Sequence, residues 1–224
     1  MPELQRTIKA LPGGIYGITA EKFSCGRSNL EVVRSMVKGG VKIVQYREKR
    51  PFKRFRQMLY ECRQIRKITR DHGVQFIVND YTDIAMIVDA DGVHVGQDDL
   101  PVKDVRKLVG TEKIIGLSTH SPRQAQAALA AGADYIGVGP IYGTHTKEDV
   151  CDPVGLEYLA YAVENVPLPF VAIGGIKQHN IDAVVARGAK TICLVTEIVG
   201  ADDIARMVQS LNQAISRALL TNKE

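Results

Sequence analysis

The sequence lacks any apolar stretch long enough to cross a membrane as a helix. Such a helix needs about 20 mainly apolar residues, and no run approaching that length occurs in these 224 residues. The first residues, MPELQRTIKALPGG, mix charges and lack the apolar core of a secretory signal peptide. We therefore expect a soluble, cytoplasmic protein that has no membrane partner.

Cysteine is scarce, and its spacing indicates neither a metal site nor a disulfide framework. Cys25, Cys62, Cys151 and Cys193 include no CxxC pair, so we expect thiols in a reducing compartment. An excess of one charge is lacking too, because 29 basic and 25 acidic residues leave a formal charge of +4. This excess is too small to indicate nucleic-acid binding, although it is compatible with anionic, phosphorylated substrates.

Several active-site signatures are also missing. No GxGxxG follows the first expected strand and no GxxxxGK[ST] occurs, so nucleotide-binding versions of an α/β fold lack support. No Ser-His-Asp or Cys-His signature indicates a covalent nucleophile.

The sequence does contain short apolar runs that alternate with helical patterns. The expected strands are 15–19, 41–45, 75–78, 92–95, 114–118, 135–139, 170–173 and 191–195. The expected helices are 28–38, 52–71, 84–88, 101–109, 122–131, 156–164, a stretch that ends at residue 188, and about 202–220. Nearly continuous apolar strands are typical of a parallel sheet covered on both faces.

This alternation predicts an α/β protein with a single (β/α)8 TIM-barrel domain over residues 1–224. Residues 1–13 are expected to be an N-terminal extension and residues 140–153 an active-site loop. In such barrels the chemistry takes place at the C-terminal ends of the strands. Those ends are nearly all polar, cationic or glycine in this chain.

The stretch 76–99 places an acid after each of two neighbouring expected strands. The run 76–78 stops at Asn79-Asp80, and the run 92–96 stops at Gln97-Asp98-Asp99. Parallel neighbours end at the same edge of a sheet, so Asp80 and Asp99 are expected to lie together. Two carboxylates suit Mg²⁺, which takes its other ligands from water and substrate phosphate. The alternative is that each acid only caps a helix.

Cations follow the second expected strand. Arg47 and Lys49 alternate along an extended segment and should face the same way. An Arg fork and a Lys point charge together suit a diphosphate. The alternative is a solvated basic face, which is the interpretation we keep for Lys53, Arg54 and Arg56.

Two further strand ends carry groups suited to anions. Ser118 follows the fifth strand, where it can hydrogen bond a ligand or cap a helix. Gly174-Gly175 follows the seventh strand and opens backbone N–H groups, at a place where many barrels bind phosphate.

The loop after the sixth strand supplies hydroxyls and a cation. Thr144, Thr146 and Lys147 are grouped as if to meet phosphate oxygens. His145 lies among them, but its neighbours already explain the loop, so we do not assign it as a general base. His94, inside the fourth strand, is better explained as a satisfied histidine of the barrel interior than as a ligand.

Six separated segments together resemble the thiamine-phosphate synthase family. They are VQYREK (44–49), VND (78–80), DGVHVGQDD (91–99), GLSTHS (116–121), GADYIGVGPIYGTHTK (132–147) and AIGGI (172–176), in that family's order and spacing. The resemblance implies a barrel that couples 4-amino-2-methyl-5-(diphosphooxymethyl)pyrimidine to a thiazole phosphate, or to its carboxylated form, giving thiamine phosphate and diphosphate. It implies Mg²⁺ as cofactor and small molecules as partners, and it leaves open a homo-oligomer.

The resemblance also implies roles for individual residues. The pyrimidine diphosphate would be held by Gln45, Arg47, Lys49, Asn79, Ser118 and Lys147, with Tyr46 and Glu48 added to the substrate-binding set. Thr144, His145, Thr146, Gly175, Val195 and Thr196 would line the thiazole-phosphate site. Asp80 and Asp99 would bind Mg²⁺, and catalysis would fall to Arg47, Lys49, Ser118 and Lys147.

The chain departs from the family pattern at a few positions. Gly143 stands where Pro is usual, Tyr81 where Arg is common, and Val195-Thr196 where an apolar-Ser pair is more usual. None of these removes a charge from the diphosphate or metal site.

Two alternative functions remain, a thiazole tautomerase-like isomerase that needs no metal and a phosphate-binding barrel without activity. Neither would make much use of the combined cations and acids.

Overall fold

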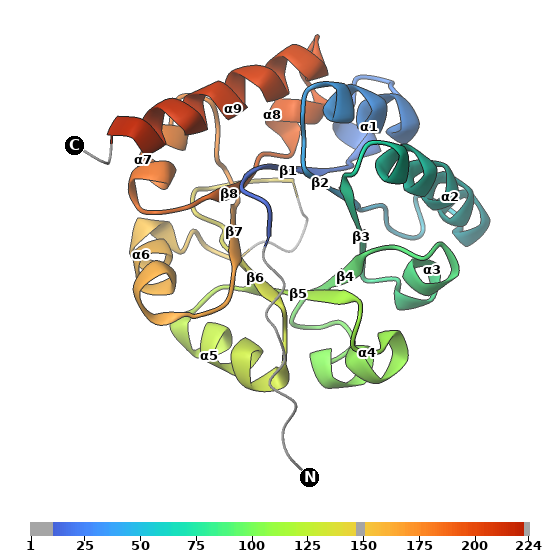
Figure 1. Ribbon diagram of the computed structural model, residues 1–224, viewed down its shortest axis with the longest axis horizontal. Helices are drawn as coiled ribbons and strands as arrows, with labels where there is room; N and C mark the ends of the chain where they lie inside the picture. Colours follow the sequence, from blue (N-terminus) through green and yellow to red (C-terminus); the bar gives the residue numbers. More distant parts are fainter. Residues whose placement is uncertain (1–10, 147–150, 222–224) are drawn as a thin grey trace.

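Eight parallel strands pair in chain order and close into a barrel, with β1 hydrogen bonded to β8 (Figure 1). This computed structural model describes residues 11–146 and 151–221. The strands are β1 (Gly14–Ile18), β2 (Ile43–Tyr46), β3 (Gln75–Asn79), β4 (Gly92–Val95), β5 (Ile114–Thr119), β6 (Tyr135–Val138), β7 (Phe170–Ile173) and β8 (Thr191–Cys193). The predicted (β/α)8 barrel is confirmed.

Helices surround the barrel and cover the outer face of every strand (Figure 1). They are α1 (Asn29–Lys38), α2 (Phe55–Asp71), α3 (Thr82–Ile87), α4 (Val102–Val109), α5 (Pro122–Ala131), α6 (Gly155–Asn165), α7 (Ile181–Ala186), α8 (Thr196–Val199) and α9 (Ile204–Thr221), with a 3-10 turn, η1 (Glu21–Phe23). The last helix, α9, packs between α7 and α1. In the part of the chain described, none of these helices has the length and apolar character that a membrane span requires.

Two helices differ from expectation by more than one or two residues, for local reasons. The long helix begins at Phe55 rather than near Phe52, because Arg54 is extended (φ −78°, ψ 148°) and its backbone N–H donates to Gln57 Oε1 at 3.1 Å. The short helix α8, between β8 and α9, was not expected. It has four residues, which is too short to show a helical period in the sequence.

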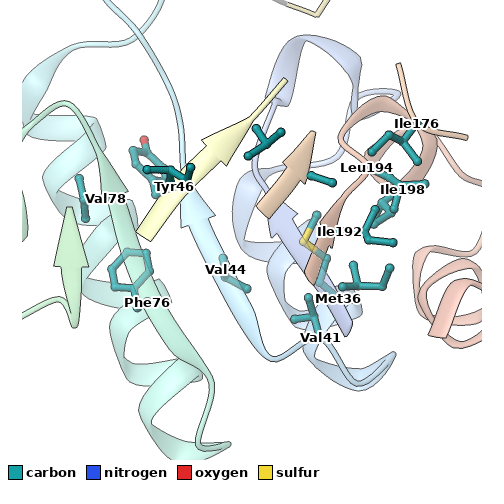
Figure 2. Packing of buried hydrophobic residues seen from close by; sticks show 14 of the residues in the cluster. Met36, Val41, Val44, Tyr46, Phe76, Val78, Ile176, Ile192, Leu194 and Ile198 are labelled. Atoms are coloured by element: carbon teal, nitrogen blue, oxygen red, sulfur yellow. The ribbon is translucent and has the colours of Figure 1, made fainter. Parts of the chain in front are cut away.

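Side chains alternate between the inside and the outside of the barrel wall. On each strand every second residue points into the barrel. These inward residues form the interior cluster Tyr16, Ile18, Ile43, Ile77, Ile114, Tyr135, Val171 and Cys193. Residues of the other parity, such as Val44, Phe76 and Ile192, pack outward against the helices (Figure 2). Because the period of a strand is two, this parity also decides which polar residues near the strand ends face the interior.

Aspartates at the start of strands tie the helices to the barrel. Asp134, just before β6, accepts from the Ile115 N–H at 2.7 Å and from the Arg106 guanidinium of α4 at 2.6 Å. Asp91, just before β4, repeats this arrangement with a β3 backbone N–H and with Arg66 of α2. Both anchors lie at the N-terminal rim of the barrel, opposite the strand ends where the chemistry is expected.

Candidate active site

A cavity of about 400 Å³ opens at the C-terminal rim of the barrel, where the strands end. Each of the eight strands contributes at least one lining residue. Among the predicted site residues, the lining includes Gln45, Arg47, Asn79, Ser118, Thr144, His145, Thr146, Gly175, Val195 and Thr196. Inward-facing residues of all eight strands therefore meet in this cavity, although they are far apart in the sequence.

A chain of hydrogen bonds crosses the floor of this cavity. Gln45 Nε2 donates to the Tyr16 hydroxyl at 2.9 Å, and the Tyr16 and Tyr135 hydroxyls are 2.9 Å apart. His94 Nδ1 lies 2.9 Å from the Tyr135 hydroxyl, and His94 Nε2 lies 2.9 Å from Ser118 Oγ. Burial raises the pKa of both tyrosines, so their hydroxyls stay protonated. The prediction that His94 is a satisfied interior histidine is confirmed.

The predicted cations and acids gather at one side of the same rim. Lys49 Nζ lies 2.8 Å from Asp80 Oδ2. The Asp99 carboxyl lies close enough to Asp80 to act on its charge, and Arg47 lies in the electrostatic field of both. Burial raises the pKa of the Asp80 carboxyl, the Lys49 ammonium opposes this, and the Asp99 charge adds to it. Two carboxyls and two cations from β2, β3 and β4 thus lie within interaction range.

The carboxylate pair fits a hard divalent cation. Two carboxyls forced close together repel each other, and a cation between them removes that repulsion. Asp99 is held in place because its Oδ2 accepts the Gly96 N–H at 2.7 Å. Asp80 is held at φ 59°, a left-handed conformation that Asp tolerates better than most residues. Within residues 11–146 and 151–221, no group of three or more His, Cys, Asp or Glu side chains is placed to hold a metal.

Arg47 is aimed into the cavity and is not fully satisfied by the protein. Its backbone N–H donates to Thr19 Oγ1 at 2.8 Å, which fixes the start of the segment after β2. Burial lowers the pKa of the Arg47 guanidinium, while Asp80 and Glu48 oppose this. Its Nε is buried and makes no hydrogen bond to any described residue. Because the Arg47 side chain lines the cavity, its guanidinium is well placed to receive an anionic ligand.

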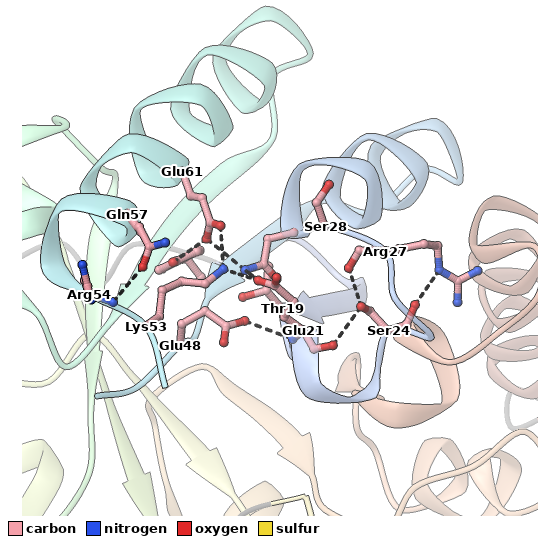
Figure 3. A network of polar contacts seen from close by, with 12 residues as sticks. Thr19, Glu21, Ser24, Arg27, Ser28, Glu48, Lys53, Arg54, Gln57 and Glu61 are labelled. Atoms are coloured by element: carbon pink, nitrogen blue, oxygen red, sulfur yellow. Dashed lines mark hydrogen bonds and ion pairs between the residues drawn. The ribbon is translucent and has the colours of Figure 1, made fainter. Parts of the chain in front are cut away.

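Two residues of the predicted substrate-binding set lie elsewhere. The Tyr46 side chain points to the outer layer, where its hydroxyl donates to Glu61 Oε2 at 2.6 Å. Glu48 accepts the Glu21 N–H at 3.0 Å and faces the network around Lys53 (Figure 3). Strand parity explains Tyr46, because its neighbours Gln45 and Arg47 face the cavity. We therefore leave these two side chains out of the proposed site.

Gly174 and Gly175 allow the loop after β6 to lie against the end of β7. They have φ values of 98° and 63°. A Cβ on Gly174 would meet Pro140 Cα at 2.4 Å, and one on Gly175 would meet the Gly143 oxygen at 2.5 Å. The Tyr142 N–H also donates to the Gly174 oxygen at 2.9 Å. The glycine pair is thus needed for this close approach, whether or not it also meets a phosphate.

The described part of the loop brings its hydroxyls to the cavity. Thr144 Oγ1 and Thr146 Oγ1 are 3.1 Å apart, and both residues line the cavity. His145 is exposed and also reaches the lining. Lys147, a predicted catalytic residue, lies outside the described residues.

Several lining residues were missed when the site was predicted from sequence, among them four with polar side chains that make hydrogen bonds. Tyr16 and Tyr135 carry the hydrogen-bond chain, and strand parity alone places them inside the barrel. His120 was not assigned to the site, yet it lines the cavity, with Nδ1 2.5 Å from the Gly139 oxygen. Lys177 directly follows the glycine turn after β7, and its Nζ lies 3.1 Å from Thr196 Oγ1. The sequence signal that could have identified Lys177 as a site residue is its position just after the Gly174-Gly175 turn.

A closed parallel barrel with a cavity at the C-terminal rim defines the class of (β/α)8-barrel enzymes. The chain belongs to the thiamine monophosphate synthase family, which matches residues 15–198. It is 64% identical to a thiamine-phosphate synthase of Pelotomaculum thermopropionicum over 92% of this chain and 94% of that protein. It is 54% identical to the thiamine-phosphate synthase of Lawsonia intracellularis, over 92% and 94% of the two chains.

A solved structure agrees with these relatives. The thiamine phosphate pyrophosphorylase of Pyrococcus furiosus superposes with a TM-score of 0.84 at 32% sequence identity. The match covers 92% of this chain and 96% of that one. Members of this family are transferases of thiamine biosynthesis that act on small molecules, and this chain is one of them.

Proposed function

We propose that this enzyme joins 4-amino-2-methyl-5-(diphosphooxymethyl)pyrimidine to a thiazole phosphate, or to its carboxylated form. The bond between the pyrimidine methylene carbon and the diphosphate oxygen breaks, and diphosphate leaves with the electron pair. The thiazole nitrogen lone pair then forms the new C–N bond, giving thiamine phosphate. From the carboxylated form the bond to the carboxyl group also breaks, CO2 leaves, and the electron pair left on the ring takes up a proton. A benzylic-type carbon on an electron-rich aminopyrimidine can carry the intermediate positive charge, so no covalent nucleophile is required.

The observation that carries this proposal is the charged group beside the cavity. Arg47, Lys49, Asp80 and Asp99 come from the ends of three strands and lie within interaction range at one rim. Charge preorganised where the leaving group departs is usually the largest catalytic contribution. An arrangement of two cations and two acids suits a diphosphate and a divalent cation together better than either alone.

The first substrate is proposed to lie between the charged group and the hydrogen-bonded floor. Gln45, Asn79 and Ser118 offer amide and hydroxyl groups to the pyrimidine. Arg47 and Lys49 bind the diphosphate and stabilise it as it leaves, and we assign the same task to Lys147. In this scheme Lys49 moves from Asp80 to the diphosphate oxygens as the substrate enters.

Asp80 and Asp99 are the proposed ligands of Mg²⁺. When bound, the cation would neutralise part of the charge that develops on the departing diphosphate. The protein's own contribution is to hold the two carboxyls in place through Gly96 and the left-handed turn at Asp80.

The second substrate is proposed to bind on the opposite side of the cavity. Thr144, Thr146, Gly175 and Thr196 surround the space where its phosphate would lie, with Val195 and His145 beside them. Holding both substrates in one cavity places the thiazole nitrogen near the reacting carbon, and proximity of this kind lowers the barrier strongly. His145 is given no proton-transfer role, since the reaction at its side of the cavity requires none.

One assay tests the proposal against its rivals. The full-length enzyme is incubated with both substrates, with and without Mg²⁺, while diphosphate release and thiamine phosphate are followed. Coupling that requires Mg²⁺ is the expected result. Isomerisation of the thiazole without coupling would instead favour the tautomerase-like alternative, and binding without turnover would favour a barrel that has no activity.

The cellular setting is part of the same proposal. We place the enzyme in the cytoplasm, because its proposed substrates are small phosphorylated metabolites. Neither a nucleic acid nor a membrane is proposed as a partner. Assembly into a homo-oligomer stays a prediction, for which a sedimentation measurement is the direct check.

A further inference from the structure

Lys177 is a lysine of the cavity that the residue assignments above leave without a role. It follows β7 and the glycine turn, and it lines the cavity together with Gly175 and Thr196. Its Nζ lies 3.1 Å from Thr196 Oγ1 and 3.0 Å from Glu197 Oε2. The side chain is about one-third exposed (35%), so the ammonium is neither buried in the core nor free in solvent.

The geometry around Lys177 holds its ammonium at the wall of the cavity. Glu197 is fixed by a second contact, because its Oε1 accepts the Gln178 N–H at 3.1 Å. The carboxylate therefore acts as a counter-charge that keeps the ammonium beside Thr196 when no phosphate is bound. An ion pair this exposed contributes little to stability by itself, so fold stability alone does not explain why the pair is placed here.

The phosphate of the second substrate would be bound more strongly by a cation beside Thr196. It is a dianion near neutral pH, and the described residues proposed to surround it offer hydroxyls, backbone groups and one histidine. Lys147, which lies outside the described part of the chain, is already assigned to the diphosphate. A hydrogen bond from a charged donor to phosphate is about twice as strong as one from a neutral donor. Lys177 is the lysine whose ammonium already contacts Thr196, a member of that group.

We propose that Lys177 is a further substrate-binding residue whose ammonium binds the phosphate of the thiazole substrate and makes the site selective for the phosphorylated form over the free alcohol. This inference rests on the proposed function, and it adds a cation to that site. On binding, the ammonium exchanges part of its contact with Glu197 for phosphate oxygens. The exchange needs only a small change of the side-chain torsions, because Thr196 and the ammonium are already in contact.

Two variants separate this role from a structural ion pair. Lys177→Met removes the ammonium, and Glu197→Gln breaks the same pair but keeps the ammonium. If the pair only stabilised the fold, both variants would change thiazole-phosphate binding to the same extent. If Lys177 binds phosphate, the two variants differ, because Glu197→Gln also removes a negative charge from the neighbourhood of the phosphate.

The test uses the full-length enzyme with steady-state kinetics and calorimetric binding of thiazole phosphate and of the thiazole alcohol. For Lys177→Met we expect the KM and Kd for thiazole phosphate to rise about 10- to 100-fold. We expect the Kd for the alcohol and the KM for the pyrimidine diphosphate to stay within about twofold. Lys177→Arg should recover most of the loss, and Glu197→Gln should leave the Kd for thiazole phosphate unchanged or lower it. Lys190→Met, an exposed lysine before β8, is the matched control.

The possible results are distinguishable. Unchanged thiazole-phosphate binding in Lys177→Met overturns the inference while the proposed function stands, as does an equal loss in Glu197→Gln. Absence of coupling in the wild-type enzyme overturns the proposed function, but calorimetry still decides whether Lys177 contributes to phosphate binding.

Discussion

At the scale of single residues, the C-terminal rim is organised by side chains that hold one another in place. Lys49 Nζ lies 2.8 Å from Asp80 Oδ2, and the Asp99 carboxyl also acts on the charge of Asp80. Arg47 is buried beside them with an Nε that no described residue accepts from. These two cations and two acids are preorganised to bind an anion and a metal cation together. The role of each side chain can be tested by a substitution of similar shape.

Asp80→Asn is expected to reduce kcat/KM by about 100-fold, because one of two carboxylates that neutralise the cation is lost. Asn tolerates the left-handed backbone at this position, so the fold should persist. The measurement is diphosphate release as a function of Mg²⁺ concentration, with half-saturation shifted to higher Mg²⁺. Asp83→Asn, an exposed acid in the first turn of α3, is the matched control. Wild-type kinetics in Asp80→Asn would remove this residue from the proposed metal site.

Tyr16→Phe is expected to lower the free energy of unfolding by about 1–3 kcal/mol, because it leaves buried polar partners without a hydrogen bond. The hydroxyl that it removes connects Gln45 to Tyr135 in the floor of the cavity. Urea unfolding followed by circular dichroism measures the difference. Tyr60→Phe, on the exposed face of α2, should leave the unfolding midpoint unchanged. Equal stability of the two variants would show that the chain of hydrogen bonds contributes nothing net.

At the scale of elements, the segment between β2 and α2 depends on a network on the outside of the barrel (Figure 3). Lys53 lies between the carboxylates of Glu21, from η1, and Glu61, from α2, and is largely buried. Asn29 of α1 donates to both carboxylates at 3.0 Å. The segment that carries Arg47 and Lys49 is thus anchored to three neighbouring elements. Lys53 is not part of a solvated basic face, and we expect it to position this segment.

Lys53→Met is expected to raise the KM for the pyrimidine diphosphate about 10-fold, because the cations on the loosened segment are no longer held in register with the acids. The KM for the thiazole phosphate should change much less, since that substrate lies on the other side of the cavity. Steady-state kinetics with each substrate varied in turn makes the comparison. Lys53→Arg should restore much of the loss, and the exposed Lys107→Met should have no effect. Equal changes in both KM values would instead indicate a general loss of structure.

At the scale of the whole molecule, the barrel separates stability from chemistry. The N-terminal rim carries the aspartate anchors, and the C-terminal rim carries the cavity and the charged group. This division is general in (β/α)8 barrels, where loops at one end can change without disturbing the packed wall.

Asp134→Ala is expected to lower the free energy of unfolding by about 3–5 kcal/mol, because the half-buried Arg106 guanidinium loses its carboxylate partner and the buried Ile115 N–H loses its acceptor. Both KM values should remain close to those of the wild type, since the substitution lies at the opposite rim from the cavity. Chemical denaturation and kinetics on the same preparation provide the two measurements. Asp104→Ala, which breaks an exposed pair with Lys107, is the control and should cost under about 1 kcal/mol. A folded but inactive Asp134→Ala would contradict the separation of the two rims.

Local sequence patterns were enough to predict the elements and much of the rim. Apolar runs and glycine turns act over a few residues, so they indicated the strands, their order and the barrel. Once the barrel is accepted, the strand ends share one rim, and this is why Asp80, Asp99, Arg47 and Lys49 could be placed together before any coordinates. The short helix α8 was missed because four residues do not show a period.

The tertiary structure alone decided which side chains meet. Tyr16 and Tyr135 are 119 residues apart, yet their hydroxyls form one hydrogen bond, and no local pattern encodes that pairing. Closure of the barrel likewise brought Lys177 beside Thr196. The physical reason is that periodicity assigns a residue to a face, whereas a contact depends on the register and curvature of strands far apart in the chain.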